Sequence, residues 1–280
     1  MNDNKISHIV KENITSVSLI KNSVSNLNYL VNKKHVVRLK RHKDHFYSYK
    51  NEREVLHKNS SLYLSERVTY LDQDGNKVSD YIANSHTFKG LDKEIIEIAK
   101  MLNKLHNSNI KTHAKFKTLK RYFYYQKITQ EKGFAHEEEI IKKVKHIYHH
   151  YPKVLCHNDV VSNNFLFTKN RSYLIDYEFA GMNIALFDIA SFISENNIED
   201  KKKIALFLEH YGYDLDNIDD LENMIMFTNL FWYYWANERY ISTKEKIYLK
   251  IKDMKKKKID NDLKALLMYK QKISELGKKN

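Results

Sequence analysis

The alternation of hydrophobic and polar positions in the first part of the chain predicts strands. Residues 14–40 read as extended, with polar breaks at residues 21–26 and 32–34 between the apolar runs. Extended runs joined by a short turn-forming segment are typical of hairpins. The pattern therefore predicts a hairpin about residues 32–34.

A helix and a second hairpin are predicted next. Residues 49–59 have helical character, and residues 67–82 give two short strands about a turn at Asp74 and Gly75. The first 80 or so residues thus predict a small sheet with one helix.

Beyond Gly90 the apolar positions change to a helical period, and Asp92 is the predicted cap of the first helix. The apolar positions at helical spacing are Ile95, Ile98, Ala99, Leu102 and Leu105. This change of period predicts a boundary between an N-terminal lobe, residues 1–83, and a C-terminal lobe, residues 84–280.

The C-terminal lobe is predicted to be mostly helical, with one exception. Residues 164–167 and 172–178 are short apolar runs that flank residues 168–171, so they are expected to pair as a hairpin.

Composition sets the class of protein. A chain of 280 residues with 42% hydrophobic content supports one large domain or two lobes. The single cysteine, Cys156, excludes an internal disulfide, and the first residues lack the apolar run of a secretion signal, so a cytoplasmic location is predicted. No apolar stretch reaches the roughly 20 residues of a membrane span.

The charge is strongly positive, with 48 lysines and arginines against 35 acidic residues, a net charge of +13. Such an excess favours anionic partners. The lysine-rich run at residues 252–260 has no accompanying nucleic-acid motif, however, so we interpret it as a solvated helix face and predict no specific nucleic-acid partner.

A catalytic pattern lies between the predicted strands of the C-terminal lobe. His157 and Asp159 are followed by Asn164, an H-x-D-x-x-x-x-N pattern, and Asp176 lies on the next strand. This set resembles the catalytic loop and the metal-binding aspartate of the protein-kinase-like superfamily, which includes aminoglycoside phosphotransferases. Phosphoryl transfer needs a positioned acceptor hydroxyl and neutralised phosphate charge, so Asp159 is assigned the first task, while Asn164 and Asp176 hold magnesium.

The alternative interpretation is a surface loop between Asp159 and Asn164, with Asp176 a lone acid at a strand edge. His157 is expected to brace the loop by hydrogen bonds, and Cys156 to be inert core.

The N-terminal sheet would then supply a phosphate-binding cation and its acidic partner. We assign these to Arg38 and Glu54, with Lys40 and Glu52 as competing assignments; Arg38 as a solvent-facing strand residue is the alternative. An arginine in this strand resembles choline and ethanolamine kinases.

The loop expected over the phosphates, residues 21–26, has no glycine, which departs from the family pattern. Ser23, Ser25 and Asn26 supply donors instead, but the contact with nucleotide is expected to be less close. The resemblance also implies that residues 79–82, with Asp80 and Ile82, contact adenine through the backbone.

The acceptor site is inferred from the C-terminal half. The segments from Ile175 to Phe179 and from Phe187 to Glu195, followed by a W-x-x-W pair, resemble the choline/ethanolamine kinase family. Trp232 and Trp235 are three residues apart and would project from one side of a helix, where indole faces attract a quaternary ammonium.

The alternative for both tryptophans is a core stripe. Glu195 would add a compensating charge, Asp188 would brace the catalytic loop, and Glu178 would steady either the metal or the acceptor amine.

These features predict an α+β, two-lobed protein-kinase-like fold with a small antiparallel N-terminal lobe and a larger, mainly helical C-terminal lobe. The predicted activity is ATP- and magnesium-dependent phosphorylation of choline to phosphocholine for phospholipid metabolism. The alternatives are a kinase of ethanolamine, thiamine or an aminoglycoside, and a catalytically silent kinase-like protein that binds anionic partners.

Overall fold

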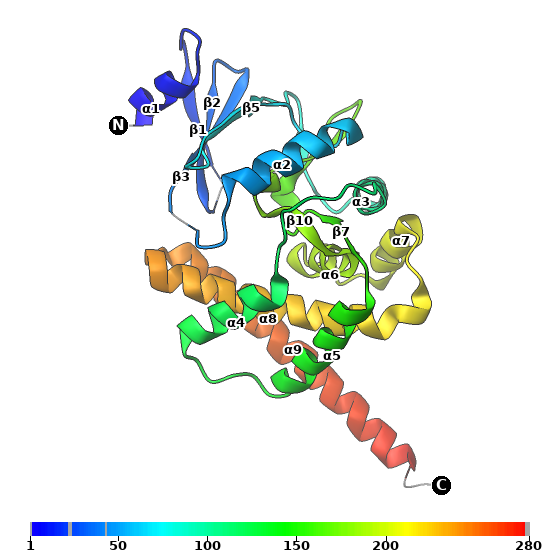
Figure 1. The fold of residues 1–280 in the computed structure, drawn as a ribbon. Helices are drawn as coiled ribbons and strands as arrows, with labels where there is room; N and C mark the ends of the chain where they lie inside the picture. The colour runs from blue at the N-terminus through cyan, green and yellow to red at the C-terminus, as the bar shows by residue number, and fades with distance from the viewer. Residues whose placement is uncertain (1, 22–23, 43, 278–280) are drawn as a thin grey trace. The chain divides into compact units, whose positions relative to one another are not determined.

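The N-terminal alternation folds into a five-stranded antiparallel sheet in the order β1-β2-β3-β5-β4. Figure 1 shows this computed structural model, which describes residues 2–21, 24–42 and 44–277. The strands are β1 (Val17–Ile20), β2 (Asn26–Val31), β3 (His35–Lys40), β4 (Val68–Leu71) and β5 (Lys77–Asp80). Both predicted hairpins are confirmed, since β2 pairs with β3 and β4 with β5.

The turn of the first hairpin lies at residues 32–34, as predicted. Asn32 and Lys33 both have positive φ, +52° and +53°, which is the conformation of a tight hairpin turn. One face of the sheet buries Val31, Val37, Leu39 and Val78 against helix α1 (Asn2–Ile9), a helix that the sequence pattern did not predict.

Helix α2 (Tyr49–Asn59) has the predicted bounds, and the Ser48 side chain accepts a hydrogen bond from the backbone N–H of Asn51. The predicted cap of α3 (Asp92–His106) is wrong. Asp92 is the first helical residue, and the backbone N–H groups of Lys89 and Leu91 instead donate to the carboxylate of Glu94.

Five short strands and two helices surround the segment that carries Asp159, Asn164 and Asp176. The hairpin of β8 (Phe165–Phe167) and β9 (Ser172–Leu174) is confirmed, and β6 (His86–Thr87) pairs with β8. A second pair consists of β7 (Lys153–Cys156) and β10 (Gly181–Ile184), which leads into α6 (Ala185–Glu195). Helix α7 (Lys201–Tyr211) packs on α3.

The chain divides into two compact units. The first comprises Met1–Phe116 and Lys153–Tyr213, and the second comprises Lys117–Pro152 and Asp214–Asn280. The predicted lobe boundary between residues 83 and 84 stays a prediction, because this division groups the N-terminal sheet with the catalytic segment.

The second unit is helical. Helix α8 (Ile218–Thr243) packs against α4 (Thr118–Thr129), α5 (Glu137–His150) and α9 (Lys246–Gly277). Tyr122 of α4 and Tyr234 of α8 both donate to the buried carboxylate of Glu137. Within the described ranges, no helix combines the length and apolar character needed to cross a bilayer.

Gly75 is required by the turn between β4 and β5. Its φ is +85°, and a Cβ atom there would lie 2.7 Å from the Tyr47 hydroxyl oxygen. Gly212 has a similar φ of +76°, but no atom lies within 4 Å of its would-be Cβ. A side chain at either glycine, both in the first unit, would strain the backbone, but only a side chain at Gly75 would also clash with another residue. Comparing the two positions therefore distinguishes the two effects.

We expect Gly75→Ala to destabilise the protein more than Gly212→Ala, by about 1 kcal/mol or more, because both variants pay the left-handed backbone cost and only the first must displace Tyr47. Urea unfolding of the two variants measures the difference. Equal losses would show that the Tyr47 side chain moves aside at no cost.

Candidate active site

Asp188 of α6 holds the loop that follows β7. One carboxylate oxygen accepts the backbone N–H of His157 at 2.7 Å, and the other accepts that of Asn158 at 2.8 Å. The His157 ring is buried, with Nε2 2.9 Å from the carbonyl oxygen of Ile175. His157 and Asp188 thus brace the loop as expected, and Cys156 is fully buried.

Asn164 closes the loop back onto Asp159. Its Nδ2 donates to the backbone carbonyl of Asp159 at 2.8 Å and to the Asp159 carboxylate at 3.0 Å. The backbone N–H of Ile175 donates to the carbonyl of Asn164 at 2.8 Å, which brings the β9 end beside it. The amide oxygen of Asn164 is left as an acceptor for a cation.

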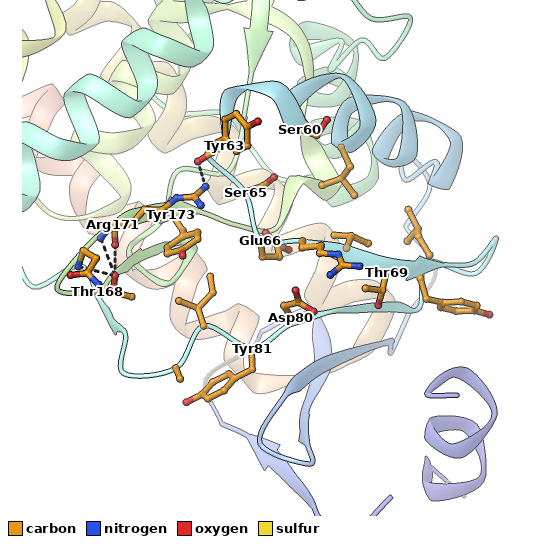
Figure 2. Close-up of a pocket in the computed structure, with 18 of the residues that line it drawn as sticks. Ser60, Tyr63, Ser65, Glu66, Thr69, Asp80, Tyr81, Thr168, Arg171 and Tyr173 are labelled. Atoms are coloured by element: carbon orange, nitrogen blue, oxygen red, sulfur yellow. Dashed lines mark hydrogen bonds between the residues drawn. The ribbon is translucent and has the colours of Figure 1, made fainter. Parts of the chain in front are cut away.

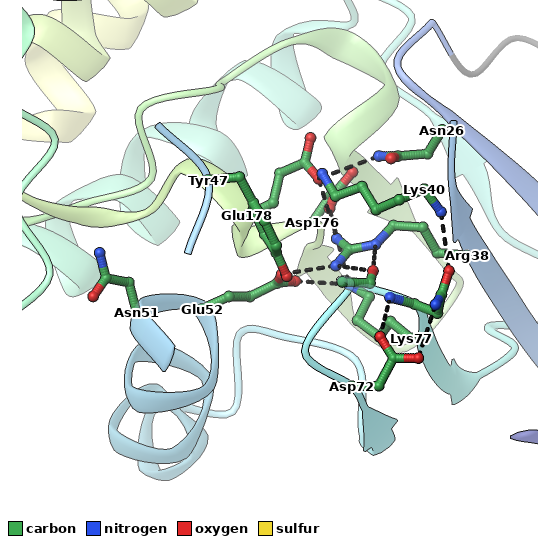
Figure 3. A network of polar contacts seen from close by, with 12 residues as sticks. Asn26, Arg38, Lys40, Tyr47, Asn51, Glu52, Asp72, Lys77, Asp176 and Glu178 are labelled. Carbon is green, nitrogen blue, oxygen red and sulfur yellow. Dashed lines mark hydrogen bonds and ion pairs between the residues drawn. The ribbon is translucent and has the colours of Figure 1, made fainter. Parts of the chain in front are cut away.

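Asp176 follows β9 in a left-handed conformation with φ of +66°. Aspartate is among the non-glycine residues that adopt this conformation most often. Here one carboxylate oxygen lies 2.8 Å from a guanidinium nitrogen of Arg38, which fixes the side chain against the N-terminal sheet (Figure 3).

Arg38 is almost completely buried and has several acceptors. Its guanidinium contacts Glu52 at 2.7 Å, Asp176 at 2.8 Å and Glu178 at 3.4 Å, and it donates twice to the carbonyl of Gly75. Burial acts to lower the pKa of Arg38, but the three carboxylates raise it above the usual value. The alternative of a solvent-facing strand residue is therefore excluded.

The predicted partner of Arg38 is wrong, and its competing assignment is right. Glu54 faces away from the sheet and accepts from Lys58 at 2.9 Å and from the backbone N–H of His113 at 3.1 Å. Residues two apart on a helix point in nearly opposite directions. Because Glu52 faces Arg38, Glu54 cannot do so.

Two polar groups near Arg38 were missed from the sequence. Lys77 of β5 lies opposite Arg38 in register, 2.9 Å from Glu66 and 3.9 Å from Asp176. The Tyr47 hydroxyl donates to Glu52 at 2.9 Å. The pairing of β3 with β5 was the available signal for Lys77, but its register required the structure.

The predicted phosphate loop is described in part. Ser23 lies outside the described residues, and Ser25 is half-buried. Asn26 is the first residue of β2 rather than a loop residue, and its Nδ2 donates to Glu178 at 3.2 Å. That amide is therefore already engaged by a carboxylate.

Asp80 and Ile82, the predicted adenine contacts, line a cavity of about 1390 Å³ (Figure 2). One face of α2, the residues from Ser65 to Leu71 and the tip of the β8–β9 hairpin complete its walls. Arg38, Asp159 and Asp176 are not among the residues that line this cavity, but Glu66 is, and its carboxylate lies 2.9 Å from the ammonium nitrogen of Lys77 in the candidate active site. A backbone contact of Asp80 and Ile82 with adenine stays a prediction.

The acids of the site differ in their protonation. Burial, together with the charges of Asp176 and Glu178, raises the pKa of Asp159 to about 8, against the lowering effect of its hydrogen bond with Asn164. Burial acts to raise the pKa of Asp176 as well, but Lys77 and Arg38 hold it below the usual value. Asp176 is thus an anion, while Asp159 titrates near neutral pH.

The donor set fits a magnesium ion. Carboxylate and amide oxygens of Asp176 and Asn164 are hard ligands of the kind that Mg²⁺ prefers. Three cations of the network in Figure 3, Arg38, Lys40 and Lys77, form ion pairs with four carboxylates, those of Glu52, Glu66, Asp176 and Glu178. Burial is the largest cause of the raised pKa of Asp159, and the charges of Asp176 and Glu178 in this cluster add to it. A divalent cation would balance that negative charge.

The predicted substrate residues fall in different units. Glu178 is buried beside Arg38, and Glu195 ends α6, both in the first unit. Trp232 and Trp235 belong to the second, where their rings meet edge to face at 5.3 Å. Trp235 also meets Tyr248 at 5.5 Å, and both indole N–H groups are buried without a partner among the described residues. A pocket that combines Glu195 with the tryptophans stays a prediction.

Comparison with known proteins identifies a family and a shared fold. A model of the phosphotransferase enzyme family matches residues 16–221. Protein LicA of Haemophilus influenzae is 25% identical over 195 residues, which covers 62% of this chain and 73% of that protein.

Two solved structures share the fold. Choline kinase LicA from Streptococcus pneumoniae superposes with a TM-score of 0.77 at 20% identity, covering 93% of this chain and 98% of that one. A choline/ethanolamine kinase family protein from Mesorhizobium loti gives 0.78 at 18% identity, covering 94% and 93%. The predicted α+β kinase-like fold, with an antiparallel N-terminal sheet and a helical C-terminal part, is confirmed.

The raised pKa of Asp159 predicts how stability depends on pH. An aspartate in the unfolded chain titrates near 3.9, so between about pH 4 and pH 8 the folded state holds a proton that the unfolded state has lost. Asp159 therefore makes the free energy of unfolding fall as the pH rises through this window. Asp159→Asn removes the effect.

We expect Asp159→Asn to match the wild type near pH 4.5 and to exceed its free energy of unfolding by about 1–3 kcal/mol near pH 8.5. Denaturant unfolding at both pH values measures this, with the exposed Asp74→Asn as the control for loss of one acid. A difference that is the same at both pH values would contradict the assignment.

Proposed function

The chain belongs to the phosphotransferase enzyme family, and we propose that it transfers the γ-phosphoryl group of ATP to the hydroxyl group of choline. It is a small-molecule kinase of the choline/ethanolamine kinase-like type. The observation that supports this activity most strongly is the convergence of the Asp159–Asn164 loop with Asp176, which follows β9 and which Arg38 ties to the N-terminal sheet. A silent relative has no chemical need for all of these groups.

Asp159 is the proposed base. With a pKa of about 8, the Asp159 side chain is mostly protonated at pH 7, so the form that accepts the proton is its ionised fraction, which grows as the pH rises toward 8. As the acceptor hydroxyl oxygen bonds to the γ-phosphorus, its proton passes to Asp159, and the bond from the γ-phosphorus to the oxygen bridging to the β-phosphate breaks. ADP then leaves with that oxygen, and phosphocholine is the product.

Arg38 and Glu52 form the proposed nucleotide clamp. The guanidinium would face the α- and β-phosphates, and Glu52 and the Gly75 carbonyl hold it in place. Asn164 and Asp176 would hold magnesium. When bound, the metal neutralises phosphate charge and orients the phosphoryl group for in-line transfer.

Choline is the proposed acceptor because two tryptophans meet on α8. An indole face stabilises a trimethylammonium group by about 2 kcal/mol when water is excluded. A primary ammonium or an aminoglycoside instead requires directed hydrogen-bond acceptors, which indole rings do not supply. This chain is similar to protein LicA of Haemophilus influenzae and to choline kinase LicA of Streptococcus pneumoniae, which supports choline as the acceptor. A cytoplasmic location and a role in phospholipid metabolism stay predictions.

The acceptor is tested by ADP release from ATP and magnesium with choline, ethanolamine, thiamine and kanamycin offered separately. We expect turnover with choline, at least about 10²-fold lower in Asp159→Ala. Trp235→Ala should raise the KM for choline about tenfold or more with a smaller effect on kcat. Turnover with another acceptor alone would sink the choline assignment, and no turnover with any acceptor would favour a silent protein or an untested substrate.

The clamp is tested by a matched pair of variants on α2. Glu52→Gln should lower kcat/KM for ATP by about 10-fold to 100-fold, because Arg38 loses the carboxylate that orients it. Glu54→Gln removes the same charge two residues away, on the other side of the helix, and should change kcat/KM less than about twofold. Equal effects of the two variants would contradict the clamp.

A further inference from the structure

Lys40 is a cation that the proposed activity does not use. Its ammonium nitrogen lies 2.5 Å from a carboxylate oxygen of Glu178 and 4.2 Å from the centre of the Tyr47 ring. The Lys40 side chain is 13% exposed and that of Glu178 is 2% exposed. This is an ion pair largely removed from water, where charge interactions are stronger than at the surface.

The position of Lys40 on its strand explains the contact. Alternate residues of a strand point to the same face, so Lys40 and Arg38 project together from β3. Their targets are also two residues apart, since Arg38 contacts Asp176 and Lys40 contacts Glu178. Two cations of one strand thus meet two acids of one short segment.

The carboxylate of Glu178 is crowded with donors. The same oxygen that contacts Lys40 accepts from Asn26 at 3.2 Å and lies 3.4 Å from Arg38. A metal ion held by Asp176 would find this oxygen already surrounded by one amide and two cationic groups. Whether Glu178 can bind a metal ion held by Asp176 therefore depends on Lys40.

We propose that the ammonium group of Lys40 competes with a divalent cation for the carboxylate of Glu178, and so sets the metal affinity of the Asp176 site. This inference rests on the proposed metal site of Asn164 and Asp176. Lys40 acts as a positioning residue: it neutralises Glu178 and limits the metal to the ligands on the catalytic loop and hairpin.

The charge balance gives the direction of the effect. With Lys40 in place, three cationic groups contact the four carboxylates of Glu52, Glu66, Asp176 and Glu178. Without Lys40, only two cationic groups remain beside the same four carboxylates. Removing one positive charge frees a carboxylate and strengthens attraction for a divalent cation. Loss of the lysine should therefore increase metal affinity, whereas loss of a residue that merely supports the fold would lower it.

The test is binding of Mn²⁺ to the nucleotide-free protein, followed by electron paramagnetic resonance of the free ion. We expect Lys40→Met to bind Mn²⁺ at least about fivefold more tightly than the wild type. Lys40→Gln removes the charge but keeps a donor for Glu178, so it should give the same direction with less disturbance of packing. Lys34→Met, at an exposed turn position, makes the same change in net charge and should leave Mn²⁺ affinity within about twofold.

A double variant identifies the carboxylate. Adding Glu178→Gln to Lys40→Met should abolish the gain. Unchanged or weaker Mn²⁺ binding in both Lys40 variants, an equal gain in Lys34→Met, or no Mn²⁺ binding in any variant would overturn the inference. The assay uses no acceptor and no turnover. An inactive protein that shows the gain would therefore sink the proposed activity alone, and an active one without the gain would sink the role of Lys40 alone.

Discussion

The buried guanidinium of Arg38 is the interaction on which the candidate site depends. Removing a charged group from water costs several kcal/mol, and partners with good geometry must offset it. Arg38 takes its partners from α2, from the β4–β5 turn and from the segment after β9. The fold of the N-terminal sheet and the position of Asp176 therefore depend on each other, because the Arg38 guanidinium has all of its hydrogen-bond acceptors only when both are in place.

The same cluster carries more carboxylates than cations, and this excess organises the chemistry. Burial raises the pKa of Asp159 to about 8 with help from the charges of Asp176 and Glu178, while Lys77 and Arg38 hold the pKa of Asp176 below its usual value against the effect of burial. Two aspartates in one small volume thus have different protonation, which suits one to accept a proton and the other to hold a cation. The backbone hydrogen bonds to Asp188 make this possible by fixing the loop on which Asp159 lies.

Sequence reasoning located the elements well where the signal was local. Turn residues and alternation predicted all three hairpins, β2–β3, β4–β5 and β8–β9. The spacing of Asp159, Asn164 and Asp176 predicted a loop that returns on itself. Sequence reasoning failed where the outcome depended on which face of a helix packs against the sheet, or on the register between two strands. Glu52 and Glu54 lie on the same helix, and only packing decides which faces the sheet. Lys77 likewise needed the register of β5 against β3, which no local pattern contains.

The lysine content shows why such residues are hard to find. In a chain with 48 basic residues, each lysine resembles the solvated majority. Lys77 and Lys255 are nevertheless buried, and the ammonium of Lys40 is largely shielded from water. Lys40 differs from the other lysines because it lies two residues from Arg38 on the same strand and so points to the same face. The acids that these two cations contact, Asp176 and Glu178, are also two residues apart. A buried arginine on a strand thus identifies which nearby lysine shares its face, and the acids opposite show what that lysine neutralises.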